Sequence, residues 1–203
     1  HPTANKQLAF LQYIGLVLAP GGRAAVVVPD NVLFEPGVGL QVRKDLVENF
    51  ELHTVLRLPV GIFYAAGVRT HVLFFNRHIK DKPANTGIWF YDLRTGMPNF
   101  TKRKALQDED FANFVAAYGT DPYGRSDRTP NARFKYFSKE EIRERHYDLD
   151  LRWDEGGENE NSPDLVDLVA QMDDALNDAR AALLEISAVI SGNSSLQNTD
   201  LDA

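Results

Sequence analysis

The sequence predicts an α/β fold that corresponds to half of a doubly wound sheet, followed by a C-terminal helix. Three observations support this: a helix–strand–helix–strand–strand–strand order within the first 95 residues, a polar glycine-bearing stretch at 154–161, and an apolar heptad beyond it. With 203 residues, 43% hydrophobic and 25% charged, the composition is that of a globular protein. No apolar run approaches the ~20 residues that span a bilayer. The absence of cysteine excludes disulfide frameworks and cysteine nucleophiles.

Each expected element of the half sheet follows from its own pattern. Apolar residues at helical spacing predict a helix over 5–18, and Pro20-Gly21-Gly22 ends it. The continuous apolar run over 23–29 predicts a strand buried on both faces, as in a parallel sheet. The same criteria give a second helix over 38–50 and further strands over 53–59, 70–75 and 87–93.

The next part of the chain is basic and irregular. Acidic residues in a first turn and apolar residues at i, i+3, i+4 and i+7 predict a helix over 108–118. Ser138 opens a capping box for a short helix, and 119–133 is expected to be a loop. The expected divisions are the half sheet at 1–95, a basic irregular extension at 96–158, a heptad helix at 159–192 and a flexible tail at 193–203.

Charge is distributed unevenly between these parts. Residues 1–153 hold 21 of the 22 Lys and Arg and 17 of the 29 Asp and Glu, a balance of +4, while residues 154–203 carry −11. The net charge of −7 therefore does not exclude a body that faces DNA. Two parts with different partners are expected.

The last helix carries the clearest pattern. Ser162 is an N-cap residue and Pro163 takes the first helical position. A strict heptad seam then follows, which predicts a surface that packs on a partner helix. The seam residues expected to bind a partner are Leu165, Val169, Met172, Leu176, Leu183 and Ile186, with Ala179 and Ile190 completing the repeat.

No complete catalytic constellation is visible, and the five histidines lack metal-ligand spacing. Two places remain as candidate substrate-binding positions. Pro29 and Asp30 follow a strand whose carboxyl end would face a ligand in a doubly wound sheet. Phe63 and Tyr64 lie in a glycine-flanked loop, where they either stack on a planar base or plug the core.

Basic residues mark a candidate DNA-binding surface. Arg69, Lys102, Arg103 and Lys104 are the residues expected to contact DNA phosphates, with Arg94 upstream and further arginines and lysines downstream. Interleaved aromatic residues at 100 and 134–137 favour this interpretation slightly. The alternative is a solvated loop region with no ligand.

Several long segments resemble the modification subunit of type I restriction-modification systems. The segments are NKQLAFLQ (5–12), PGGRAAVVVPD (20–30), LRLPVGIF (56–63), GVRTHVLFF (67–75), WFYDLR (89–94), FSKEEI (137–142) and YDLD (147–150). The resemblance covers most of residues 5–190 and implies that 1–95 is the C-terminal half of the methyltransferase catalytic domain and that 159–192 is an assembly helix. It implies a Rossmann-like, S-adenosylmethionine-dependent adenine-N6 DNA methyltransferase in the cytoplasm.

The resemblance also implies roles for the candidate residues. Phe63 and Tyr64 would lie near the target adenine, Pro29 and Asp30 would border the active-site cleft, and the heptad helix would pack on the specificity subunit. In the full complex the partners would be DNA, the specificity subunit and the restriction subunit. The sheet is expected to place the 70–76 strand between the 24–29 and 53–58 strands, antiparallel to both, and to leave the outer edge of the 24–29 strand open or covered by another chain.

Two motifs that the resemblance implies do not occur in the sequence: the glycine-rich cofactor loop and the Asn/Asp-Pro-Pro-Tyr/Phe catalytic motif. The chain alone is therefore expected to lack catalytic residues, to bind no S-adenosylmethionine and no metal, and to be inactive. The alternative function is a non-enzymatic interaction module that docks on the specificity subunit or self-associates through its C-terminal helix.

Overall fold

The computed structural model describes residues 1–63, 68–78, 84–98, 100–101 and 104–151, and five residues further on: Leu176, Arg180, Leu183, Leu184 and Ser187. The chain divides into two compact units, His1–Trp153 and Asp154–Ala203. This division coincides with the point at which the charge of the sequence changes from basic to acidic.

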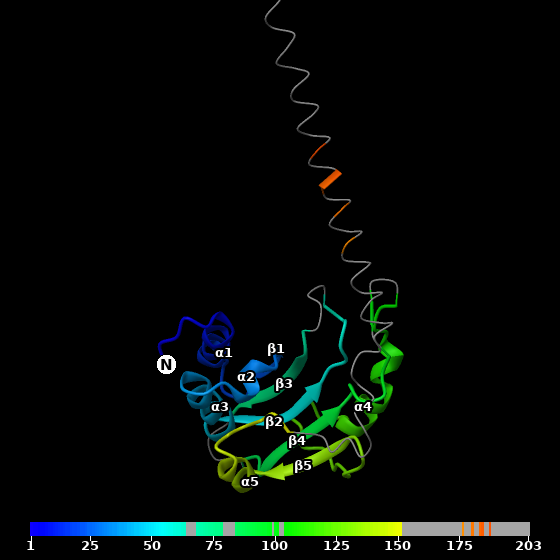
Figure 1. The fold of residues 1–203 in the computed structure, drawn as a ribbon. Helices are drawn as coiled ribbons and strands as arrows, with labels where there is room; N and C mark the ends of the chain where they lie inside the picture. Colours follow the sequence, from blue (N-terminus) through cyan, green and yellow to red (C-terminus); the bar gives the residue numbers. More distant parts are fainter. Residues whose placement is uncertain are drawn as a thin grey trace, which may run out of the picture. The chain divides into compact units, whose positions relative to one another are not determined.

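A five-stranded sheet with the order β1-β3-β2-β4-β5 forms the centre of the first unit (Figure 1). Strand β3 lies between β1 and β2 and is antiparallel to both, whereas β4 is parallel to β2 and β5 is antiparallel to β4. The α/β fold and the predicted position of the third strand are therefore confirmed. The strands are β1 (Arg23–Pro29), β2 (Phe50–Arg57), β3 (Thr70–Arg77), β4 (Gly87–Asp92) and β5 (Phe134–Ser138).

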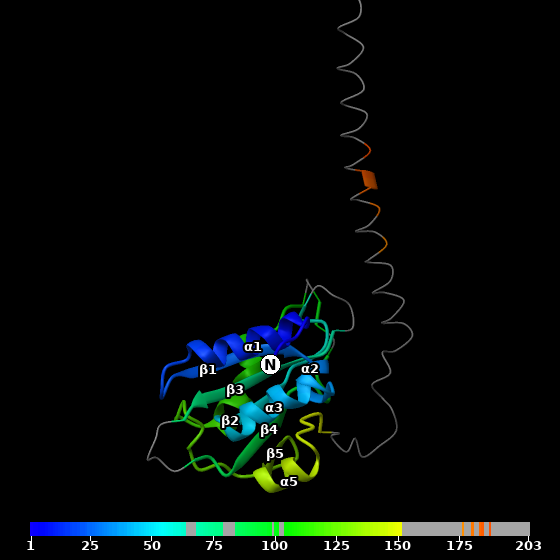
Figure 2. The same ribbon diagram turned by 90° about the vertical axis from the view of Figure 1, so that its left-hand side faces the viewer.

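One side of the sheet, here called the helical face, is covered by helices (Figure 2). They are α1 (Lys6–Val17), α2 (Asn31–Phe34), α3 (Val38–Glu48) and α5 (Lys139–Glu144). Their buried residues are mainly aliphatic and join Leu52, Leu73 and Phe75 of the sheet in one core cluster. Helix α1 begins where the Asn5 side chain accepts hydrogen bonds from the backbone N–H groups of Gln7 and Leu8.

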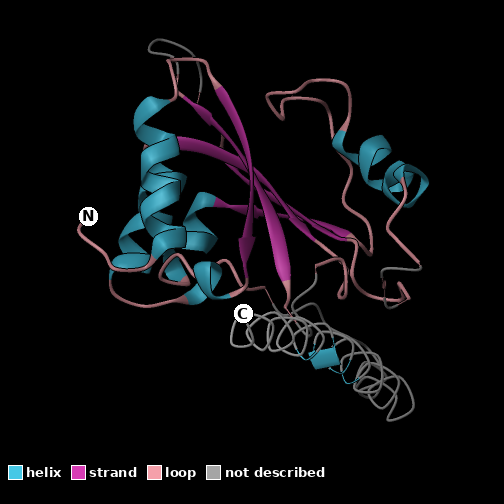
Figure 3. Ribbon diagram, turned by 90° about the horizontal axis from the view of Figure 1, so that it is seen from above, coloured by secondary structure: helices cyan, strands magenta, loops and turns pink. Residues whose placement is uncertain are grey.

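The opposite side, here called the loop-covered face, carries much less helix (Figure 3). It holds the 3-10 turn η1 (Asp108–Phe111), the helix α4 (Ala112–Tyr118) and the loop at 119–133. A mainly aromatic cluster fills this side, including Phe74, Tyr91, Phe114 and Phe134. The predicted 108–118 helix therefore forms, with its first turn wound as 3-10.

Strand β1 differs from the expectation that it is buried on both faces. Its burial alternates, and the side chain of Val27 is 51% exposed. The prediction was wrong because β1 is the outermost strand and the described loop at 119–133 covers the sheet mainly over β2 and β3. Within the described residues β1 pairs only with β3, so its outer edge is open, as predicted.

The segment expected to be an irregular extension at 96–158 also contributes to the sheet. Strand β5 pairs along β4 with Phe134 opposite Tyr91, and the predicted capping box at Ser138 opens α5. Residue 95 is therefore not a boundary between compact units. The alternating pattern of β5 was missed because arginines and lysines interrupt this region of the sequence, and the short helix α2 was missed because it has a single turn.

In the C-terminal unit the described residues are helical and exposed. Leu176 and Leu183, both on the predicted heptad seam, are 64% and 66% exposed. The other seam residues expected to bind a partner lie outside the described residues: Leu165, Val169, Met172 and Ile186. Among the residues described, no helix has the length and apolar character needed to cross a membrane.

Candidate functional site

The carboxyl ends of β1, β2 and β4 meet the start of β3 at one edge of the sheet, called the carboxyl edge below. Backbone pairing aligns Pro29 with Thr70, and aligns Arg57 with both His71 and Asp92. Ligands bind at this edge in doubly wound sheets. The edge gathers five charged or titratable side chains from four elements: Asp30, Arg57, His71, Asp92 and Arg94.

Asp30 lies between a histidine and an arginine. Its Oδ1 is 3.1 Å from Nδ1 of His71 and 3.5 Å from Nη2 of Arg94. Burial opposes ionisation of Asp30, but His71, Arg94 and Arg69 outweigh it and lower the pKa of this carboxyl below its usual value. Burial also lowers the pKa of His71, so we assign the His71 ring as neutral and Asp30 as an anion held by the arginines.

Asp92 closes β4 and is fully buried. Its Oδ1 accepts hydrogen bonds from the backbone N–H groups of Arg94 and Thr95 and lies 3.5 Å from Nη1 of Arg57. Buried charges are costly unless they are paired and hydrogen-bonded. The Asp92 carboxylate therefore fixes the turn that presents Arg94.

The loop at 59–69 leaves this edge between β2 and β3. Its base is closed by a hydrogen bond from the backbone N–H of Leu58 to the carbonyl of Thr70, 3.1 Å long. Gly61 has φ +84° and a Cβ there would lie 2.1 Å from the Phe100 carbonyl, so only glycine fits. Phe63 is 44% exposed, so the core-plug alternative does not hold for it. Tyr64 lies outside the described residues.

The structure brings the turn after Pro29 and the described ends of the 59–69 loop to the same edge. The backbone N–H of Asp30 donates to the carbonyl of Arg69 at 3.1 Å, which joins the turn after Pro29 to the end of the 59–69 loop. His71, Arg57, Asp92 and Arg94 were not predicted as members of the site. A signal was present, since three of them immediately precede or follow an apolar strand segment.

The candidate DNA-binding residues divide differently. Arg69 and Lys104 are exposed, and Lys102 and Arg103 lie outside the described residues. Arginines further along the basic stretch make internal contacts instead. Arg128 donates to Thr54 Oγ1 at 2.9 Å and to the Tyr118 carbonyl at 3.0 Å, and Arg125 donates to Glu51 Oε2 at 3.3 Å.

A polar cavity of about 480 Å³ lies on the loop-covered face. Two of the downstream arginines from the candidate DNA-binding stretch, Arg128 and Arg133, line it. Its lining residues are Tyr91, Asn113, Ala116, Ala117, Asp127, Arg128, Thr129, Asn131 and Arg133.

The described residues do not form a cofactor loop. The turns after β1, β2 and β4 begin with Asp30, Leu58 and Leu93, and none has the G-x-G-x-x-G spacing of a nucleotide-binding loop. Nor does any group of three or more metal-ligating side chains occur within the described ranges.

Comparisons with known proteins identify the family of the chain. The sequence profile of the family described as N-6 DNA Methylase matches residues 1–162. The chain is 41% identical, over 94% of its length, to the type I restriction enzyme EcoKI methylase subunit of Escherichia coli, and 40% identical to the StySPI methylase subunit of Salmonella potsdam. In both cases it spans 42% of the relative's length.

Solved structures show the same likeness. The crystal structure of the EcoKI M protein superposes on the whole chain with a TM-score of 0.72 and 41% identity, and the chain covers 48% of that protein. A second structure, from a study of complex assembly in a type I system, gives a TM-score of 0.66 at 32% identity over 95% of the chain. The family inferred from the sequence segments is confirmed: the chain belongs to the N-6 DNA methylase family, and its relatives are methylase subunits of type I restriction enzymes.

Proposed function

We propose that this chain is part of the modification subunit of a type I restriction-modification enzyme, which transfers a methyl group from S-adenosylmethionine to N6 of adenine in DNA. The observation that carries the proposal is 41% identity to a type I methylase subunit over 94% of the chain. The carboxyl edge supports this proposal, because the loop that carries the exposed Phe63 starts at the same edge as the turn that carries Asp30.

The role of this edge follows from the reaction. An adenine inside a duplex has to leave the base stack before its amino group can be methylated, and aromatic side chains hold such bases by stacking. Phe63 and Tyr64 are proposed to receive the target base, with Pro29 and Asp30 at the rim of the same cleft. Arg69, Lys102, Arg103 and Lys104 would contact the phosphates beside it.

The chain alone is proposed to be inactive. The Asn/Asp-Pro-Pro-Tyr/Phe motif and a glycine-rich cofactor loop are absent from its sequence. S-adenosylmethionine would supply the methyl group in a longer subunit, which would also hold the catalytic motif. The fragment would contribute the base-binding side of the cleft.

The open edge of β1 fits this arrangement. Beside it, α1 exposes Phe10, Tyr13, Leu16 and Val17, an apolar surface that an isolated chain leaves in water. The chain spans less than half the length of the relatives it matches. A preceding part of a longer subunit is proposed to cover this surface and pair with β1.

The heptad helix would bind a protein partner. The exposed leucines 176 and 183 are free to pack on another helix, and an acidic isolated helix gains stability by burying its seam. The specificity subunit is the proposed partner, with the restriction subunit joining the full complex. The alternative is a homo-oligomer formed through the same seam. In that case the chain would be a non-enzymatic interaction module.

Methylation is tested with the complete modification subunit and its specificity subunit. Labelled S-adenosylmethionine should transfer its methyl group to adenine in DNA, and the 203-residue chain assayed in parallel should transfer none. Absence of transfer by the complete enzyme would refute the proposed reaction. Micromolar binding of S-adenosylmethionine to the chain alone in a calorimetric titration would refute its proposed lack of a cofactor site.

The partner is tested by substituting the seam. The double variant Leu176→Asp, Leu183→Asp should lose binding to the specificity subunit, whereas Leu184→Asp, one position off the seam, should retain it. Sedimentation of the same variants without a partner separates the two interpretations. Unchanged binding by the double variant would rule out the seam as the interface.

A further inference from the structure

Arg94 makes an unusual set of contacts for a residue in a turn. Its Nε donates to the Leu58 carbonyl at 2.9 Å, and its Nη2 donates to the Thr70 carbonyl at 3.2 Å. These two carbonyls flank the 59–69 loop, one at the end of β2 and one at the start of β3. A single guanidinium from the β4 turn therefore links both feet of that loop.

Arg94 is itself held on two sides. Its backbone N–H donates to the buried Asp92 carboxylate at 3.0 Å, and its Nη2 lies 3.5 Å from the Asp30 carboxylate. Only 12% of the Arg94 side chain is exposed. The residue thus connects the turn after β1, the loop between β2 and β3, and the turn after β4.

Without the Arg94 guanidinium, the loop would be held only by backbone hydrogen bonds at its base. The Thr70 carbonyl also accepts the Leu58 N–H, and the Phe100 N–H donates to the Val60 carbonyl at 3.2 Å. These bonds close the base of the loop, and the Asp30 N–H ties its far end to the turn after β1 through the Arg69 carbonyl, but none of the three joins the loop to β4. A planar guanidinium satisfies two carbonyls and a carboxylate at once, which a lysine ammonium on a flexible stem reproduces poorly.

We propose that Arg94 is a positioning residue that holds the described ends of the 59–69 loop, residues 59–63 and 68–69, on the carboxyl edge, so that Phe63 meets the flipped target base. This proposal rests on the proposed function for the identity of the substrate. The positioning itself is a property of the chain and is measured without any substrate. The internal contacts of Arg94 distinguish it from a phosphate-binding arginine.

The first test is amide hydrogen exchange of the 203-residue chain. In Arg94→Gln, peptides within 59–69 should exchange ~10-fold faster, the effect of losing charge-assisted hydrogen bonds to the backbone. Arg94→Lys should fall between this variant and the wild type. The control Arg143→Gln removes an arginine that pairs with Glu48 on the helical face and should leave 59–69 unchanged.

Two outcomes would overturn the proposal. One is unchanged exchange over 59–69 in both Arg94 variants. The other is an equal increase throughout β2 and β3, which would show a general loss of stability rather than release of the loop.

The second test uses the complete modification subunit with its specificity subunit. Arg94→Gln should lower kcat/KM for duplex DNA by ~10-fold or more while leaving KM for S-adenosylmethionine unchanged. A mismatch at the target adenine lowers the cost of flipping and should recover part of that loss. An equal change in both KM values, or no recovery with the mismatch, would overturn the role of Arg94. Failure of the wild-type enzyme to methylate would instead refute the proposed function and leave the exchange result standing.

Discussion

The two faces of the sheet are held largely by different kinds of interaction, although the buried Arg43 also donates to three backbone carbonyls on the helical face. On the helical face, aliphatic side chains from four helices interlock with Leu52, Leu73 and Phe75. On the loop-covered face, an aromatic cluster is joined by polar anchors. Asn76 donates to the Tyr123 carbonyl at 3.1 Å, and Arg128 donates to Thr54. Helices bury a periodic apolar stripe, whereas an irregular segment needs individual bonds for its backbone groups.

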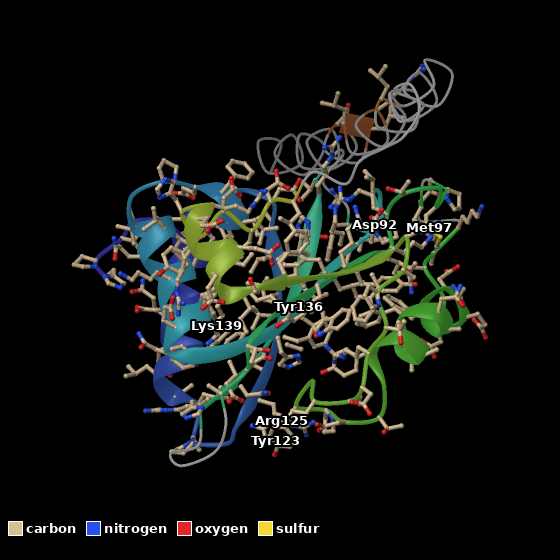
Figure 4. The ribbon with its side chains drawn as sticks, turned by 90° about the horizontal axis from the view of Figure 1, so that it is seen from below. Asp92, Met97, Tyr123, Arg125, Tyr136 and Lys139 are labelled. Atoms are coloured by element: carbon tan, nitrogen blue, oxygen red, sulfur yellow. The ribbon has the colours of Figure 1, made fainter. Side chains whose placement is uncertain are left out.

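Figure 4 shows where the polar anchors lie, with Tyr123 and Arg125 beside each other and far from Asp92 and Met97. The Tyr123 ring is flanked by Arg23 and Arg125, whose guanidinium carbons are 5.3 and 5.9 Å from its centroid. The part of the loop around Tyr123 therefore covers the end of the sheet opposite the carboxyl edge. The end of the loop reaches the carboxyl edge itself, where Arg133 exchanges backbone and side-chain hydrogen bonds with the backbone of Asp92.

The largest expected effect is on the helical face. Leu11 is 1% exposed, and Leu11→Ala should lower the free energy of unfolding by about 2–5 kcal/mol because it leaves a cavity among packed side chains. Urea denaturation measures this loss. The matched control is Leu16→Ala on the same helix, which is 76% exposed and should cost less than about 0.5 kcal/mol. Similar losses in the two variants would show that the α1 core contacts are not the stabilising ones.

The anchors of the loop-covered face should give a smaller and more local effect. Arg128→Ala removes the donor to the Tyr118 carbonyl and one of the two partners of Thr54 Oγ1, which keeps His53, at a cost of about 1–3 kcal/mol. Amide exchange should rise over 119–133 and remain slow in α3. Equal acceleration of α3 and the loop would contradict the separation of the two faces.

The difference between the faces also explains what the sequence predicts well. The sequence predicts the 6–17 and 38–48 helices from apolar periodicity, and it predicts the strand order from the family segments. The polar anchors could not be predicted, because pairs such as Thr54 and Arg128 are distant in the sequence and follow no periodic pattern. At the candidate site, Asp30 and Phe63 were predicted from their position after a strand and in a loop. Arg94 was interpreted as a member of a basic stretch, and only its contacts reveal an internal role.

The stability of the loop-covered face should depend on pH through the buried His53. A β-bulge between Leu52 and Thr54 accompanies the orientation of His53 toward Tyr118 and Gly124. Gly124 has φ +73° and a Cβ there would lie 2.2 Å from His53 Nδ1, so the loop sits directly on the ring. Burial, with Arg128 and Arg125 nearby, lowers the pKa of His53 from 6.5 to about 3.

This lowered pKa makes the stability of the folded protein depend on pH. Between pH 3 and 6.5 the unfolded chain binds a proton that the folded His53 does not, so stability rises with pH through that window. One such proton contributes at most about 1.4 kcal/mol per pH unit. His53→Gln should therefore flatten the dependence of the unfolding free energy on pH between 4 and 6, measured by urea denaturation. Parallel profiles for the variant and the wild type would show that His53 is protonated in the fold.

The smallest effect is expected at the exposed rim of the helical face. Glu48 at the end of α3 accepts two hydrogen bonds from Arg143, both 2.7 Å, and one from the Tyr147 hydroxyl at 2.9 Å. These bonds, chiefly those from Arg143, lower the pKa of Glu48 from 4.5 to about 2. The stability they provide is therefore present above pH 4.5 and is lost as the pH falls toward 2.

Arg143→Ala should raise the Glu48 pKa toward 4.5, as followed by NMR titration. Because 43% of the Arg143 side chain is exposed and screened by solvent, stability at neutral pH should change little and that change should shrink with added salt. A large loss of stability in this variant would mean that polar contacts support the helical face as much as they support the loop-covered one.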